Sequence, residues 1–149
     1  MSIGRSDTGR GVVLHASTVD IDGSGVLITG ASGTGKSALA LELMARRARL
    51  VADDRTHLDV RSGQLIASCP RQIAGMIEAR GVGLLRADAV ETSQIMLAID
   101  LDQTETERLP ARRQVTIAGV SVPLLCKIAA PHFAAAILQY IRGGYIEAP

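Results

Sequence analysis

Short runs of apolar and β-branched residues recur along the chain, and clusters of turn-forming residues separate them. This pattern predicts strands for most of the sequence. The predicted strands are residues 12–21, 25–29, 50–52, 56–61, 64–68, 93–101, 114–118 and 120–125. The separating turns at residues 22–25, 62–63 and 119 are short, so they predict β-hairpins.

Helical patterns are confined to three segments. Residues 37–45 are a run of strong helix formers, and we expect this helix to end near Arg49. Pro70 and the apolar residues that follow it predict a short amphipathic helix that ends before Gly81. Residues 131–142 predict a C-terminal helix.

Hairpins and helices occur together in the predicted order of elements. Hairpins argue against an all-parallel, doubly wound sheet and favour a mixed one. No repeat, low-complexity tract or linker interrupts the 149 residues. We therefore predict one α/β domain over residues 1–149, with residues 102–113 as a charged loop between late strands.

A glycine-rich segment between the predicted strand 25–29 and the helix after it carries the first chemical signal. Residues 30–37 read GASGTGKS and fit the P-loop pattern G-x-x-x-x-G-K-[ST]. In that motif the loop amides and the helix N-terminus surround phosphate groups, the lysine reaches the β/γ-phosphates and the hydroxyl binds Mg²⁺. We expect ATP or a similar polyphosphate here, with Lys36 on an exposed loop. The predicted nucleotide-binding residues are Gly30, Ala31, Ser32, Gly33, Thr34, Gly35, Lys36 and Ser37.

Composition narrows the choice of partners and compartment. The net charge of +1 and an aromatic content of 2% argue against nucleic acid as a partner. No apolar run is long enough to span a membrane, and residues 1–11 contain no apolar segment of a signal peptide. We expect a cytoplasmic protein in which Cys69 and Cys126 are reduced thiols.

A P-loop enzyme also needs a carboxylate near its metal ion, usually after a buried strand. Asp100 follows the strong apolar run at residues 95–99, whereas Asp53 and Asp54 follow the shorter run at residues 50–52. Neighbouring residues at a strand end point to opposite sides, so one of the paired aspartates could face the metal and the other an acceptor hydroxyl. The pattern alone leaves both positions open.

Four segments resemble the C-terminal kinase domain of bacterial HPr kinase/phosphorylase. They are His15-Ala16-Ser17, GVLITGASGTGKS at residues 25–37, ALELMARRARLVADD at residues 40–54 and IEARGVG at residues 77–83. The resemblance extends over about residues 12–101. It implies a mixed-sheet P-loop fold of the HPr kinase/phosphoenolpyruvate carboxykinase type. It also implies an ATP- and Mg²⁺-dependent kinase for a serine of the phosphocarrier HPr, assembled as a homohexamer, and many members also remove the phosphate by phosphorolysis.

The same resemblance assigns roles to individual residues. It implies that Lys36 contacts the β/γ-phosphates and that Asp54 takes the proton from the acceptor serine and returns it in the reverse reaction. The implied metal ligands are Ser37, Asp53 and Glu78. Arg80 is a charged neighbour of Glu78, and His15 matches an active-site histidine near the phosphates. These implications favour Asp53 and Asp54 over Asp100.

The chain departs from the family's usual pattern in ways that keep other functions open. It resembles the short, one-domain members, and residues 122–131 lack the arginine that the family places in a late turn near phosphate. Phosphorylase activity is therefore an open question, and the acceptor is HPr or a paralogue of it. The alternatives are a small-molecule P-loop kinase and a module that senses ATP without transferring phosphate.

Overall fold

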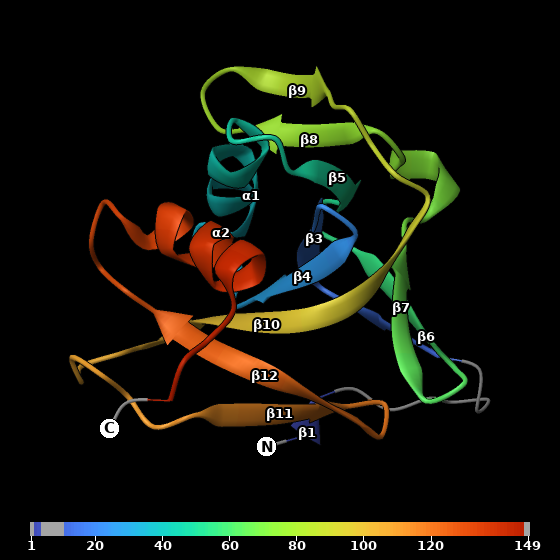
Figure 1. The fold of residues 1–149 in the computed structure, drawn as a ribbon. Coiled ribbons are helices and arrows are strands. Elements are labelled where there is room, and N and C mark those ends of the chain that lie inside the picture. The colour runs from blue at the N-terminus through green and yellow to red at the C-terminus, as the bar shows by residue number, and fades with distance from the viewer. Residues whose placement is uncertain (1, 4–10, 148–149) are drawn as a thin grey trace.

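Ten strands of one mixed sheet form the frame of the molecule in a computed structural model that describes residues 2–3 and 11–147 (Figure 1). The main path of this sheet is β1-β11-β12-β10-β4-β3-β5; β7 joins it beside β10, β6 pairs with β7 and β2 pairs with β6. The first strands are β1 Ser2–Ile3, β2 Val12–Leu14, β3 Ala16–Ile21, β4 Ser24–Thr29 and β5 Arg49–Ala52. The later strands are β6 Thr56–Arg61, β7 Gln64–Ser68, β10 Thr92–Thr104, β11 Arg113–Ile117 and β12 Val120–Lys127.

Strand directions decide where the loops of the site meet. Strand β10 is parallel to both β4 and β12, and β3 is antiparallel to β4. The carboxyl ends of β4, β10 and β12 therefore lie at one edge of the sheet, and the segment 30–35 leaves the sheet there. In open sheets with parallel strands, ligands are commonly bound beyond the carboxyl ends of the strands.

Two helices, α1 Lys36–Met44 and α2 Phe133–Gly143, cover one face of the central strands (Figure 1). Leu43 and Ile137 are fully buried in the core between these helices and the sheet. A second core, which includes Leu27 and Leu58, lies on the opposite side. The central strands are therefore buried on both faces, which explains their nearly continuous apolar sequences. Neither helix of the described chain has the length and hydropathy of a membrane-spanning segment.

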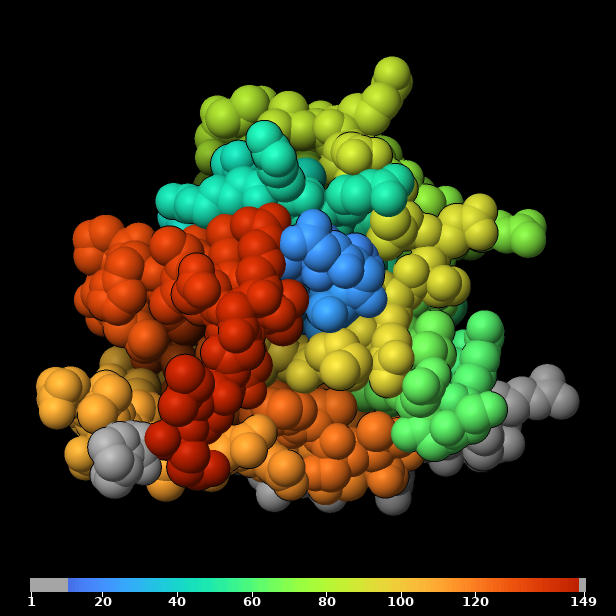
Figure 2. Space-filling model, viewed as in Figure 1, coloured from blue at the N-terminus to red at the C-terminus, as the bar shows by residue number. Residues whose placement is uncertain are grey.

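The end of α2 is fixed to the early part of the chain. Figure 2 shows the C-terminal segment beside the surface formed by the β3–β4 turn. Arg142 donates to a carboxylate oxygen of Asp22 in that turn at 2.8 Å and to the carbonyl oxygen of Arg46, just after α1, at 3.2 Å. One side chain thus connects both helices to the β3–β4 hairpin.

Most of the predicted elements are confirmed. The three hairpins β3–β4, β6–β7 and β11–β12 form at the predicted turns. The predicted strand 93–101 is the core of β10, which continues to Thr104, and the C-terminal helix is α2. The run 12–21 is two strands, with a bend at His15 between them. The mixed α/β sheet is as predicted. The polar N-terminal segment falls mostly on residues 4–10, outside the described residues.

The predicted helix after Pro70 is wrong. The segment contains a single 3₁₀ turn, η1 Arg71–Ile73, and then β8 Met76–Ala79, which pairs with β9 Gly83–Arg86 in a separate two-stranded sheet. Ile77 and Ala79 are buried whereas Met76 and Glu78 are exposed, which is the alternation of a strand. The apolar run was too short for its period to separate helix from strand.

Helix α1 also ends earlier than predicted, at Met44 instead of near Arg49. Arg47 adopts a left-handed conformation with φ of 78°, and the amide of Ala48 donates to the carbonyl oxygen of Leu43 at 3.1 Å. This is the geometry that commonly closes a helix C-terminus. The turn returns the chain directly into β5.

Candidate active site

The segment between β4 and α1 has the conformation that its glycines predict. Gly30, Gly33 and Gly35 have φ angles of 148°, 85° and 100°, which side chains other than glycine rarely adopt. A β-carbon at Gly30 would also lie 2.6 Å from Oγ1 of Thr34. No side chain caps the N-terminus of α1, so its first amides and the positive end of its dipole face the loop. This arrangement suits an anion such as phosphate.

Lys36 begins α1 and folds back over the loop. Its Nζ donates to the carbonyl oxygens of Gly30 at 2.8 Å and Ala31 at 3.1 Å. The loop is exposed at residues 31–33 and 35, as predicted, but Lys36 itself is only 9% exposed, so the prediction that it lies out on that loop is wrong. Lys36 nevertheless lines the pocket described below.

Asp53, directly after β5, is the centre of a hydrogen-bond network. Its Oδ1 accepts the hydroxyls of Ser17 at 2.8 Å and Ser37 at 2.6 Å, and its Oδ2 accepts the backbone amide of Glu78 at 3.0 Å. Asp53 is only 7% exposed. The fold therefore brings together the three predicted metal-binding residues from three separate parts of the chain.

Asp54 lies on the other side of the strand end, as expected for neighbouring residues. It is exposed, and its backbone has a φ of 67°, which is uncommon for a residue other than glycine. Its amide donates to Oγ of Ser17 at 3.4 Å. Its side chain faces a pocket of about 550 Å³, a size typical of small-molecule sites.

Most of the predicted site residues line this pocket. They are Ser32, Gly33, Gly35, Lys36, Ser37, Asp54, Glu78 and Arg80. The other predicted residues of the loop and of the metal site, Gly30, Ala31, Thr34 and Asp53, are not part of its wall. His15 is exposed and also lies outside the wall, although it precedes Ala16, whose partner in β4 is Thr29 at the start of the loop.

Asp100 was the other candidate for the carboxylate near the metal ion, and its hydrogen bonds differ from those of Asp53. It is 8% exposed, and its Oδ1 accepts the amide of Asp102 at 2.8 Å. Asp102 in turn accepts the amide of Ala31 at 2.9 Å. This pair therefore braces the start of the P-loop, whereas Asp53 contacts the P-loop hydroxyl of Ser37.

The residues around Asp53 fit a magnesium ion. Hydroxyl and carboxylate oxygens are the ligands that Mg²⁺ prefers, and it usually takes few of them from the protein and the rest from phosphates and water. Accordingly, the described part of the chain contains no cluster of three or more histidine, cysteine or acidic side chains arranged as a metal cage. Within the same part, no basic side chain forms an ion pair with Asp53, so its charge is left for a cation.

Some residues of the site were missed in the sequence. Ser17 belongs to a segment that resembles the family, but the sequence did not predict its contacts with Asp53 and with the amide of Asp54. Leu41 and Val82 form apolar parts of the pocket wall. The available signal was a run of polar residues in a predicted strand, Ser17, Thr18 and Asp20, since a buried hydroxyl or carboxylate needs a partner.

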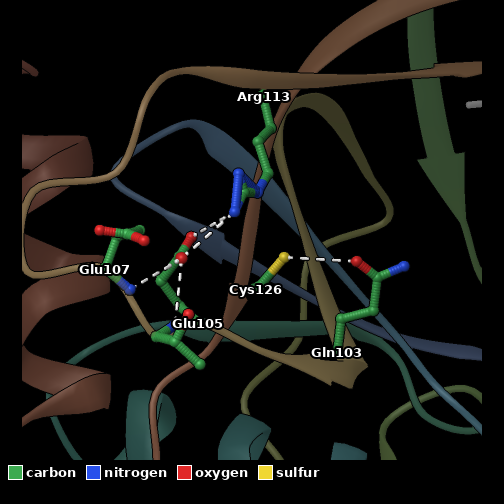
Figure 3. Close-up of polar contacts among 6 residues, drawn as sticks. Gln103, Glu105, Glu107, Arg113 and Cys126 are labelled. Atoms are coloured by element: carbon green, nitrogen blue, oxygen red, sulfur yellow. Dashed lines mark hydrogen bonds and ion pairs between the residues drawn. The ribbon is translucent and has the colours of Figure 1, made fainter.

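A second polar cluster lies around the loop after β10 (Figure 3). Glu105 forms an ion pair with Arg113 at 3.0 Å and accepts the amides of Thr106 and Glu107. The thiol of Cys126 lies 3.8 Å from Oε1 of Gln103, which is a weak contact. The hollow beside this cluster measures about 40 Å³, too small for a nucleotide. We therefore interpret these contacts as structural: they hold the loop between β10 and β11 in place.

Both cysteines are free thiols, as predicted. Burial raises the pKa of Cys69, and the negative charge of Asp53 raises it further. Burial is also the main cause of the raised pKa of Cys126. Asp53 therefore lies close enough to Cys69 for its charge to disfavour the thiolate.

The chain is similar to known proteins in sequence and in structure. The family model described as HPr Serine kinase C-terminal domain matches residues 8–131. The HPr kinase/phosphorylase of Limosilactobacillus reuteri (strain DSM 20016) is 40% identical over 123 residues, which cover 74% of this chain and 38% of that protein. The corresponding protein of Clostridium beijerinckii is 37% identical over 124 residues, which cover 75% of this chain and 41% of that protein.

A solved structure is similar over most of both chains. The structure of the HPr(Ser) kinase/phosphatase from Coxiella burnetii superposes with a TM-score of 0.74 and 30% sequence identity, covering 88% of this chain and 94% of that one. The chain spans about two fifths of the length of the curated relatives named above.

Proposed function

This chain belongs to the HPr serine kinase C-terminal domain family, and we propose that it is an ATP-dependent kinase for a serine of HPr or an HPr paralogue. The observation that carries the proposal is the joining of the P-loop hydroxyl of Ser37 to Asp53 at 2.6 Å, with Asp54 exposed in the adjoining pocket. The family and this geometry point to the same residues. In this proposal residues 1–149 are one catalytic domain, active in the cytoplasm as a homohexamer.

The P-loop and Lys36 would bind the donor phosphates. Amides of the loop and of the uncapped first turn of α1 would donate to phosphate oxygens, and Lys36 would exchange its contacts with the Gly30 and Ala31 carbonyls for phosphate oxygens. Ser37, Asp53 and Glu78 would hold Mg²⁺, which neutralises charge on the β- and γ-phosphates when bound. Arg80, in the same wall, would add a positive charge for the phosphates. The role of His15 near the phosphates rests on the family resemblance, since His15 is exposed and lies outside the pocket wall.

Asp54 would be the general base. It accepts the proton of the serine hydroxyl as the serine oxygen bonds to the γ-phosphorus and the bond to the β–γ bridging oxygen breaks, which releases ADP. In the reverse reaction, inorganic phosphate attacks the phosphoserine phosphorus, Asp54 returns the proton to the serine oxygen, and pyrophosphate is released. The same atoms serve both directions, so retention of phosphorolysis is a question of binding the attacking phosphate.

A protein acceptor explains the surroundings of the pocket better than a metabolite. The hairpin β8–β9 carries Glu78 and Arg80, and its apolar residues Val82 and Leu84 are 75% and 72% exposed. Val82 is also part of the pocket wall. Apolar side chains exposed at the mouth of a site suit contact with a second protein, which supports HPr over a small-molecule substrate.

The test is transfer of labelled γ-phosphate from ATP in the presence of Mg²⁺ to HPr and, separately, to HPr whose acceptor serine is replaced by alanine. The proposal predicts label on the first protein and none on the second. Label on a small molecule only would indicate the metabolite kinase. ATP binding without any transfer would indicate the sensing module.

A further inference from the structure

Ser17, in the middle of the site network, has no role in the proposed reaction so far. It lies in β3 and is fully buried. Its Oγ donates to Asp53 at 2.8 Å and accepts the backbone amide of Asp54 at 3.4 Å. Among the described residues, no other side chain forms hydrogen bonds with both aspartates, and every buried side-chain polar atom there has a partner.

We infer that Ser17 is a positioning residue: it orients the metal-side carboxylate of Asp53 and holds the backbone that presents Asp54. The inference rests on the proposed function for the roles of the two aspartates. A serine hydroxyl has one proton and two lone pairs. Donation of that proton to Asp53 leaves the lone pairs for the Asp54 amide, so a single hydroxyl fixes both neighbours.

The two contacts of Ser17 differ in strength. The bond to Asp53 is short and has a charged acceptor, whereas the contact with the Asp54 amide, at 3.4 Å, is near the limit of a hydrogen bond. Two hydroxyls on Oδ1 and one amide on Oδ2 hold the Asp53 carboxylate in one orientation. Loss of Ser17 should therefore affect Mg²⁺ binding more than proton transfer.

The backbone of Asp54 gives a second reason. A residue other than glycine with φ of 67° occupies a sparsely populated conformation, which persists only where its surroundings hold it. The Asp54 amide has Ser17 as its side-chain partner. Without that partner, the exposed carboxylate of Asp54 would sample more positions in the pocket.

Strand β3 also provides a matched control. Near the other end of β3, Asp20 accepts a hydrogen bond at 2.6 Å from the hydroxyl of Ser93 in the neighbouring part of the sheet, β10. Ser93 is 6% exposed. Asp20 also accepts the amide of Gly23, so this bond supports the β3–β4 turn, far along the strand from the P-loop. The substitutions Ser17→Ala and Ser93→Ala therefore remove the same kind of buried hydroxyl–carboxylate bond, one at the site and one away from it.

The experiment compares the full chain with the variants Ser17→Ala, Ser93→Ala and Ser17→Thr. The measured quantities are the Mg²⁺ concentration that half-saturates ATP binding, and kcat and KM for transfer to HPr. Loss of a residue that orients a metal ligand typically costs about 10- to 100-fold in metal affinity or activity. We expect Ser17→Ala to raise the Mg²⁺ requirement by that factor and to lower kcat by a smaller factor, with KM for HPr unchanged.

The controls separate positioning from stability. Ser93→Ala should lower the melting temperature while its Mg²⁺ requirement and kcat stay at wild-type values, and Ser17→Thr, which keeps the hydroxyl, should restore both quantities. A wild-type Mg²⁺ requirement in Ser17→Ala, or equal losses in both alanine variants, would overturn the inference.

Two further outcomes remain decisive. If Ser17→Ala does not fold, Ser17→Cys replaces the hydroxyl with a weak donor of similar shape, and an unchanged Mg²⁺ requirement in that variant overturns the inference. If the wild-type protein transfers no phosphate to HPr, the proposed function fails, yet the Mg²⁺ dependence of ATP binding still tests Ser17.

Discussion

Two carboxylates in this molecule have similar hydrogen bonding and opposite electrostatic surroundings. Asp53 accepts two hydroxyls and an amide, all uncharged donors. Glu105 accepts two amides and also the guanidinium of Arg113, a resident cation (Figure 3). Both side chains are nearly buried, with 7% of Asp53 and 9% of the Glu105 side chain exposed. The difference between them is therefore charge balance.

The pKa values of the two cysteines are shifted in keeping with this difference. Near Cys69, the charge of Asp53 adds to burial in raising the thiol pKa. Near Cys126, where burial again raises the pKa, Arg113 acts in the opposite direction to Glu105 and Asp100. A carboxylate that is hydrogen-bonded but unpaired is suited to receive a cation from outside, whereas one with a resident arginine is suited to hold a loop. The first is our candidate for metal binding and the second is structural.

The largest effect is expected from Lys36→Ala, because it removes the positive charge proposed to contact the donor phosphates and leaves the Glu105 cluster untouched. Transfer of phosphate to HPr should be nearly abolished. Lys36 also donates to two loop carbonyls, so the melting temperature should fall moderately while the circular dichroism spectrum stays that of the folded protein. Transfer at the wild-type rate by the folded variant would contradict the P-loop assignment.

Asp54→Asn should separate chemistry from binding. The amide has almost the same shape but cannot take the serine proton, and general-base catalysis typically contributes about 10²- to 10⁴-fold. We expect the transfer rate to fall by that order and the affinity for ATP, measured by calorimetry, to change little. Any phosphorolysis should fall in parallel. If ATP binding is lost as well, Asp54 is a metal-binding or structural residue.

Asp53→Asn tests the unpaired carboxylate directly. Without its negative charge, the Mg²⁺ concentration required for ATP binding should rise by about 10- to 100-fold. Titration of ATP binding with Mg²⁺ measures this quantity. The corresponding change Asp100→Asn should leave it close to the wild-type value, and the reverse result would assign the metal to Asp100.

Glu105→Gln makes the same kind of change, from carboxylate to amide, in the cluster where Arg113 balances the negative charge. It removes the charge opposite Arg113, whose side chain is 40% exposed and therefore partly screened by solvent. We expect a loss of about 1 kcal/mol in the free energy of unfolding, measured by urea denaturation, with no change in the Mg²⁺ requirement. A changed Mg²⁺ requirement would mean that the two regions are coupled and that the comparison between them does not hold.

The smallest effect concerns thiol reactivity. At pH 8, below the raised pKa of Cys69, the thiolate fraction increases as that pKa falls. Asp53→Asn removes the smaller of its two causes, so alkylation of Cys69 by iodoacetamide without Mg²⁺ should accelerate by less than about tenfold. Cys126, whose surroundings are unchanged, is the internal control. An unchanged rate at Cys69 would mean that the charge of Asp53 is already balanced.

The sequence was sufficient for the parts of the fold that carry local signals. Turn residues at 22–25 and 62–63 fixed two hairpins, and the glycines of the P-loop fixed its conformation, because each requires a backbone that few other residues adopt. The segment after Pro70 was misread because its core-facing residues, Ile77 and Ala79, are too few to show a period. Its partner strand β9 is exposed along its whole length and so has no apolar pattern.

For the candidate site, the sequence and the family resemblance named the polar and glycine residues of the pocket wall but not its apolar residues Leu41 and Val82. The pattern of residues alone did not separate Asp53 from Asp100, since both aspartates come at the ends of buried apolar runs, and only the family resemblance favoured Asp53. What distinguishes them is contact with Ser37, which depends on how β5 returns beside β3 after α1. Ser17 was missed for the same reason: its partners lie 36 and 37 residues away in the chain.

The anchoring of the P-loop to β10 has a consequence for how the protein folds. Thr29 donates to the carbonyl of Ile99, and Ala31 to Asp102, so residues about seventy positions later in the sequence complete the loop. Closing a loop of about seventy residues costs conformational entropy before these contacts can form, and contacts between distant residues slow folding. During synthesis the complete motif leaves the ribosome well before β10 does. Under the proposed function, we therefore expect the nascent chain to bind phosphate only after its central strand β10 has paired with β4.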